Sequence, residues 1–175
     1  PPRSTLFPYT TLFRSALRKE VLGLKHPATL GSMNNLASLY GSQGRYEQAE
    51  PLYSETLALS KEILGLKHPN TLTSMNNLAG LYYSQGRYEQ AEPLYTETLA
   101  LSKEILGLKH PDTLGSMNNL ALLYNSQGRY EQAEPLYIET LALSKEILGL
   151  KHPNTLTSMN NLAGLYEAQG RYEQA

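Results

Sequence analysis

Four histidines, each followed by proline, are the residues of this chain with the most versatile chemistry. They recur every 42 residues, as His26, His68, His110 and His152. Imidazole nitrogens bind Zn²⁺ when they lie about 2 Å from a common ion. Equivalent positions on stacked helices are on the order of 10 Å apart, since helix axes pack at 8–10 Å. We therefore expect these histidines to start helices, and we expect no metal site.

Acid–base catalysis is the second chemistry to weigh. Glu47 and Glu50 are three positions apart and recur in the later copies. Both fall in the first turn of an expected helix, whose positive end a carboxylate stabilises. Cysteine is absent, which excludes disulfides and thiolate metal sites. We expect no catalytic residue, no cofactor and no enzymatic activity.

The histidine spacing reflects a 42-residue unit copied in tandem. ALRKEVLGLKHP at 16–27, for example, matches ALSKEILGLKHP at 58–69. A period of 20 to 50 residues is typical of solenoids, in which each unit buries its apolar face against its neighbours. We expect the end of a truncated repeat at 16–27, repeats at 28–69, 70–111 and 112–153, and a truncated repeat at 154–175. Since both ends fall inside a repeat, we expect a fragment of a longer array.

Residues 1–15, PPRSTLFPYTTLFRS, align with no part of the repeat. They resemble a translated short-read sequencing adapter, and we interpret them as a non-native segment. A signal peptide would need a longer apolar core and a small-residue cleavage site. A flexible native tail is the remaining alternative. Because three prolines oppose helix formation, we expect the segment to add nothing to the fold.

Charge and hydropathy limit the classes of partner that the chain is expected to bind. Removing Arg3 and Arg14 from the 15 basic residues leaves 13 against 16 acidic ones, a net charge of about −3. Phosphate binding needs clustered Lys and Arg, so we expect no nucleic-acid partner. No apolar run approaches the roughly 18 residues of a membrane helix, so we expect no membrane partner and a cytoplasmic location.

The sequence of each repeat predicts two antiparallel helices joined by a short Ser-Gln-Gly-Arg connection. The first runs from about Pro27 to Gln43, because proline suits the opening position and Gly44 ends the run. The second runs from about Tyr46 to Leu64, with Gly65 as its cap. Helical spacing predicts a first-helix core of Leu30, Met33, Leu36, Ala37 and Tyr40, with Leu39 at the margin. In the second helix it predicts Ala49, Leu52, Tyr53, Thr56, Leu57, Leu59, Ser60 and Ile63.

These residues resemble the tetratricopeptide repeat family. Its signature is met by Leu36, Ala37, Tyr40, Gly44, Ala49 and Tyr53, and the match covers residues 16–175. Met33 replaces the usual early Trp, and the period is 42 instead of 34. The longer unit is similar to the kinesin-light-chain subclass, which is also widespread in bacterial signalling proteins. The resemblance implies an all-α, right-handed superhelix whose first helices line a concave groove for peptides.

Comparison of the four copies with one another also indicates a binding face on the first helix of each repeat. Five of the six variable columns lie on the first helix, and at about 100° per residue they share the side opposite the core. An Asn pair on that side is retained in all four copies. The candidate groove residues are Asn34, Asn35, Ser38, Gly41, Asn76, Asn77, Gly80, Tyr83, Asn118, Asn119, Leu122, Asn125, Asn160, Asn161 and Glu167.

A solvated face that is free to vary would give the same pattern. Asn is, however, a mediocre helix former, and its carboxamide can bind both the N–H and the C=O of an extended peptide. Alternatively, one Asn of each pair bonds a neighbouring helix. We predict an α-solenoid scaffold that binds a peptide or protein segment. The alternatives are the sensor arm of a larger signalling ATPase or protease, and end-to-end self-association through uncapped repeats.

Overall fold

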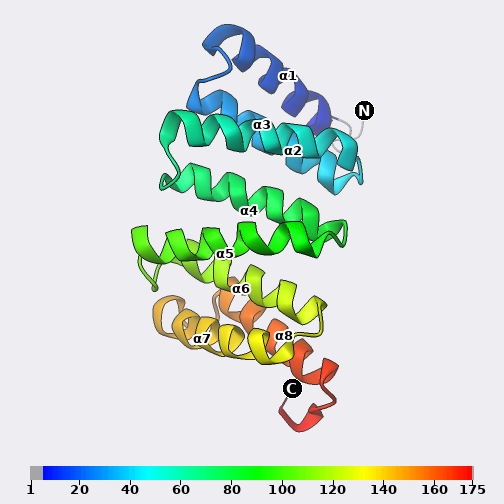
Figure 1. Cartoon of the computed structure of the whole chain (residues 1–175), viewed down its shortest axis with the longest axis vertical. Coiled ribbons are helices and arrows are strands. Elements are labelled where there is room, and N and C mark those ends of the chain that lie inside the picture. Colours follow the sequence, from blue (N-terminus) through cyan, green and yellow to red (C-terminus); the bar gives the residue numbers. More distant parts are fainter. Residues whose placement is uncertain (1–5, 175) are drawn as a thin grey trace. The chain divides into compact units, whose positions relative to one another are not determined.

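The chain forms an all-α fold, as predicted. The computed structural model describes residues 6–174, with side chains from residue 10 onward, so residues 1–5 of the adapter-like segment lie outside the described part. Figure 1 shows the helices in chain order, and their bounds are α1 Leu6–Leu22, α2 Pro27–Ser42, α3 Tyr46–Leu64, α4 Pro69–Ser84, α5 Tyr88–Ile105, α6 Pro111–Ser126, α7 Tyr130–Leu148, α8 Pro153–Ala168 and the 3-10 helix η2 Tyr172–Gln174. Within residues 6–174, no helix combines the length and the apolar character that a membrane span requires.

The helices belong to two compact units, which are described separately. The first unit spans residues 1–85 and contains α1 to α4, and the second spans residues 86–175 and contains α5 to η2. In the first, α2 packs against α1, α3 and α4, and α3 also packs against α4. In the second, α6 packs against α5, α7 and α8, and α7 also packs against α8. Both units are therefore stacks of consecutive helices.

Histidine caps start the first helix of each repeat, which confirms the prediction for these residues. The Nδ1 atoms of His26 and His68 accept hydrogen bonds at 3.1 Å from the backbone N–H two residues later. Those of His110 and His152 do the same at 3.2 Å. Proline follows each histidine at the opening helical position, where its missing N–H costs nothing. The recurring dipeptide is thus a helix-start signal.

Glycines set the helix ends close to where the sequence predicts them. The α2 helix ends at Ser42 with Gln43 as its C-cap, and α3 occupies Tyr46–Leu64 as predicted. Gly44 and Gly65 have φ of +71° and +84°, a region that side chains with a Cβ rarely adopt. The two turns therefore need glycine.

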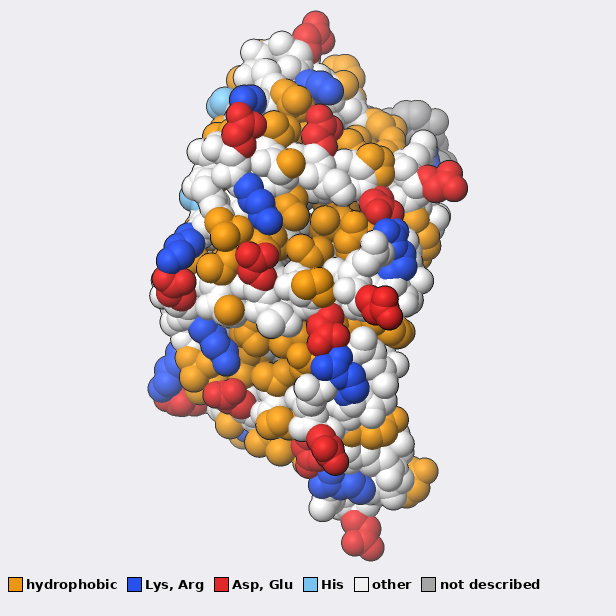
Figure 2. All heavy atoms as spheres, in the orientation of Figure 1, with side chains coloured by type: hydrophobic (Ala, Val, Ile, Leu, Met, Phe, Trp, Pro, Cys, Tyr) orange, Lys and Arg blue, Asp and Glu red, His pale blue; other side chains and the backbone are white. Residues whose placement is uncertain are grey.

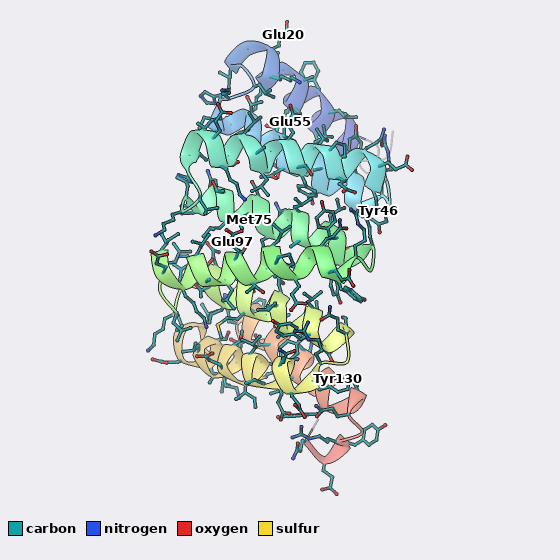
Figure 3. All side chains as sticks on the ribbon, in the orientation of Figure 1. Glu20, Tyr46, Glu55, Met75, Glu97 and Tyr130 are labelled. Carbon is teal, nitrogen blue, oxygen red and sulfur yellow. The ribbon has the colours of Figure 1, made fainter. Side chains whose placement is uncertain are left out.

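The apolar core follows the predicted stripes with one correction. Met75, labelled in Figure 3, and Met117 have no exposed surface, and the retained Ala79 and Ala121 of the same helices are also fully buried. Leu39 is half-buried, as its predicted marginal position implies, whereas its counterparts Leu81, Leu123 and Leu165 are only 5 %, 0 % and 0 % exposed.

The correction has a packing cause. A Cβ added to Gly41 on α2 would lie 3.5 Å from Leu81 Cδ1 on α4. The leucine thus packs against the first helix of the preceding repeat. Tyr82, expected in the core, is half-buried. The buried side of the first helix is therefore wider than a stripe facing only its own partner helix.

Two columns of buried hydroxyl side chains were not predicted. Thr29, Thr71, Thr113 and Thr155 are all 0 % exposed, and the serine three residues later is at most 4 % exposed. Thr71 Oγ1 donates to the Gly65 carbonyl at 2.8 Å, and Ser74 Oγ donates to the Asn70 carbonyl at 3.0 Å. Burial of a hydroxyl is inexpensive when a local carbonyl accepts its proton.

The adapter-like segment contradicts one prediction. Helix α1 begins at Leu6 and continues without a break to Leu22, so the expectation that residues 6–15 would not be helical is wrong. Pro8 lies in the first turn of α1, where no intrahelical N–H bond is lost. Ser15 is buried, whereas Phe13 is 68 % exposed.

Arginine–glutamate ion pairs join successive repeats in the second unit. Arg129 Nη1 lies 2.6 Å from Glu92 Oε2, and Arg171 Nη1 lies 2.7 Å from Glu134 Oε2. The Arg129 guanidinium also stacks 4.3 Å from the centre of the Tyr124 ring. Each ion pair joins the turn between the two helices of one repeat to the second helix of the preceding repeat.

Candidate functional site

In each unit a cleft lies between consecutive first helices. In the first unit the cleft lies between α2 and α4, with Ser60 and Leu64 of α3 beneath it, and has a volume of about 230 Å³. In the second unit it lies between α6 and α8, with Ser144 and Leu148 of α7 beneath it, and has a volume of about 160 Å³. The face selected from the sequence is therefore hollowed in both units.

Five of the predicted groove residues line the two clefts. Asn34, Asn35 and Asn77 line the first cleft, and Asn118 and Asn119 line the second. The other predicted residues lie outside these two clefts: Ser38, Gly41, Asn76, Gly80, Tyr83, Leu122, Asn125, Asn160, Asn161 and Glu167. Among these, Ser38 lines a separate cavity of about 430 Å³ together with Arg14 and Arg18.

Some of the Asn side chains bind neighbouring helices, as the alternative interpretation holds. Asn34 Nδ2 on α2 donates to Ser74 Oγ on α4 at 3.0 Å. Asn161 Nδ2 on α8 donates to Asn118 Oδ1 on α6 at 2.9 Å. Asn35, by contrast, has an exposed side chain. The two members of this pair therefore differ: Asn34 bridges two helices, whereas Asn35 is open to solvent.

The variable column that begins at Gly41 is not uniformly exposed to solvent. Leu81 Cδ1 approaches Gly41 in the first unit. In the second unit, Asn125 Oδ1 is buried and has no hydrogen-bond partner among the described residues. Tyr83 is half-buried, and Glu167 is exposed. This column thus varies at a helix–helix contact as well as at the open face.

Sequence reasoning left several cleft residues out of the candidate set. Gly31, Asn70 and Thr73 line the first cleft, and their counterparts line the second. Their signal was present, because these positions belong to the variable columns of the first helix. Ser60 and Leu64 carried no such signal, since they repeat unchanged and were assigned to the core or to the end of the second helix.

The clefts are electrically neutral. All residues lining the two clefts are Pro, Leu, Gly, Asn, Ser or Thr. Figure 2 shows acidic and basic side chains interspersed over the face that it presents.

Burial raises the pKa of the Tyr53 phenol above its usual value of 10.0, and a hydrogen bond with Ser38 lowers that pKa by a smaller amount. Tyr53 therefore stays uncharged at neutral pH.

Comparison with known proteins identifies relatives of the repeats. The family described as Tetratricopeptide repeat matches residues 15–62, 28–104, 70–142 and 112–175. No curated protein matches significantly.

Solved structures share the fold. Nearly identical TPR-like repeats from Podosopora anserina, assigned as those of a kinesin light chain, match with TM-scores of 0.77 and, for a point variant of these repeats, 0.79. Both are 28% identical, over 95% of this chain and 79% of theirs. BtubC (BKLC) from P. vanneervenii matches with a TM-score of 0.76 and 27% identity, over 85% of this chain and 59% of its own. The repeats are thus similar to kinesin-light-chain TPR-like repeats.

Proposed function

The chain belongs to the tetratricopeptide repeat family, and from this membership we propose that it binds a peptide or protein segment along its first helices. Repeats of this family typically mediate protein–protein interactions and in general act without catalysis. Stacked helical repeats present extended surfaces that suit such a role. We propose that the binding residues are those of the two clefts and the open Asn side chains beside them.

One observation carries this proposal: each cleft is lined by one of the Asn pairs that all four copies retain. Asn35 on α2 and Asn119 on α6 line the clefts of the two units. A carboxamide supplies a donor and an acceptor, so it can pair with the main chain of an extended peptide whatever its sequence. A merely solvated face would not explain why a mediocre helix former is kept there.

A selection from displayed random peptides tests the proposal. Peptides enriched on the native chain are titrated by calorimetry against the double variant Asn35→Ala/Asn119→Ala. Each lost buried pairing should weaken binding by about 1–3 kcal/mol, while circular dichroism shows unchanged helicity.

The matched control changes the second helices. Glu55 on α3, labelled in Figure 3, and Glu139 on α7 are exposed and 84 positions apart. The double variant Glu55→Ala/Glu139→Ala should bind as the native chain does. Equal affinity in the Asn double variant, or an equal loss in the control, would move the binding site away from the first helices.

A further inference from the structure

The two clefts are copies of each other at an interval of 84 residues, which is twice the repeat length. Ten of the eleven residues that line the second cleft have a counterpart of the same type 84 positions earlier in the first. In both, a glycine on one first helix is paired with a threonine on the next: Gly31 with Thr73, and Gly115 with Thr157. Each unit therefore holds one complete site made by two unlike repeats.

The size of the clefts fits one side chain. Their volumes of about 230 and 160 Å³ fall below the roughly 300–1,000 Å³ of pockets that take free small molecules. They exceed several times the roughly 30 Å³ that a water occupies. A Cβ added to Gly31 or Gly115 would meet no atom within 4 Å, so the space over these glycines is open. The natural occupant is thus part of a larger molecule.

The hydrogen-bonding groups of the clefts leave acceptors facing a ligand. Thr73 Oγ1 donates to the Pro69 carbonyl at 3.1 Å, and Ser74 Oγ donates to the Asn70 carbonyl at 3.0 Å. Their counterparts in the second unit donate to the equivalent carbonyls at 3.0 Å. Ser74 Oγ is fully buried and also accepts from Asn34 Nδ2, so the hydroxyl oxygens that can accept from a bound group are those of the exposed Thr73 and Thr157. In the first cleft, Asn34 Oδ1 is a further acceptor, since it is buried and has no hydrogen-bond partner among the described residues. The exposed carboxamides of Asn35, Asn70 and Asn154 add donors at the clefts.

A primary carboxamide matches these features. It offers N–H donors for the threonine hydroxyl and the carboxamide oxygens of the cleft, and one carbonyl for the exposed Asn donors. It is also uncharged, and a charged group would lose its hydration in a neutral cleft without gaining an ionic partner. We propose that each unit takes one Asn or Gln side chain of a bound peptide into its cleft. This inference rests on the proposed function and names the residue type that the site selects.

Two leucine substitutions block the clefts without weakening the helices. Leu at Gly31 or Gly115 fills the open space, and leucine is a better helix former than glycine, so thermal stability should be kept or raised. Each single variant should bind the Asn- or Gln-bearing peptide less tightly, and the double variant at least about tenfold less tightly. Ala58→Leu and Ala142→Leu, at exposed positions of α3 and α7, are the controls and should leave affinity unchanged.

The probe is the displayed library of random short peptides, followed by synthetic versions of the enriched sequences. Enrichment of Asn or Gln at one position is expected, and replacing Gln by Glu there should weaken binding at least about tenfold, because shape is kept and charge is added. Enriched peptides anchored by charged or aromatic residues, or ones insensitive to both leucine variants, would overturn this inference and leave the proposed function standing. If no peptide is enriched, the proposed function fails and the inference with it.

Discussion

Two adjacent leucines on α6 provide the sharpest test of the helix packing. Leu123 is 0 % exposed, whereas its neighbour Leu122 is only half-buried. Leu→Ala removes three carbons, and each buried methylene is worth about 0.8 kcal/mol, which gives roughly 2.4 kcal/mol for transfer alone. The cavity left in a closed site adds to this, so we expect Leu123→Ala to cost about 3–4 kcal/mol. Leu122→Ala should cost about 1 kcal/mol, because part of its side chain remains in water.

Urea denaturation followed by far-UV circular dichroism measures the difference. Both variants should unfold with the slope of the native chain, so that the midpoints report stability directly. The comparison is internally controlled, since the two substitutions share chemistry, helix and turn. Equal midpoints would show that the side of α6 assigned to the core is wrong. They would also undermine the assignment of the opposite side to ligand binding.

Three further predictions concern stability. Thr71→Val should destabilise by about 0.5–1.5 kcal/mol because it removes one of the two hydrogen bonds that the Gly65 carbonyl accepts, whereas Thr113→Val should be neutral or stabilising, since Thr113 Oγ1 has no hydrogen-bond partner among the described residues; the urea midpoints of the two variants test this difference. The Arg171 hydrogen bond lowers the pKa of Glu134 below 4.5, so its stabilisation is present above that pH and is lost as the pH falls through the lowered value. Glu134→Gln should therefore flatten the decline in stability as the pH falls below 4.5, and an unchanged slope would contradict this. Because Leu12 and Phe13 are exposed, deleting residues 1–14 should leave the melting temperature within about 2 °C, and a larger drop would show that the first part of α1 stabilises the repeats.

Local signals in the sequence were sufficient to predict the helices of the repeats. Pro27 and Gly44 bracket α2, and Tyr46 and Gly65 bracket α3, because proline and glycine act through their own backbone geometry. The buried position of Leu81 was not predictable in the same way. It depends on the distance between α2 and α4, which one helix pattern does not contain.

The candidate site was predictable as a face but not as a cleft. Variation among copies selected the correct side of the first helix, yet it could not show which Asn would bridge helices. Asn34 donates to Ser74 across the contact, while Asn35 stays exposed, although the two are adjacent and identical. The helical content of residues 6–15 was missed because composition was judged without position. A proline in the first turn of a helix does not oppose it.

The alternation of glycine and threonine along the first helices has a genetic consequence. Near-identical copies invite unequal recombination, which adds or removes whole repeats. A change of one 42-residue copy would set two repeats of the same kind side by side and lose the Gly31–Thr73 type of pairing at that junction. A change of 84 residues would preserve every pairing. Selection on the clefts would therefore make such arrays grow and shrink by two repeats at a time, with the pair of repeats as the inherited unit.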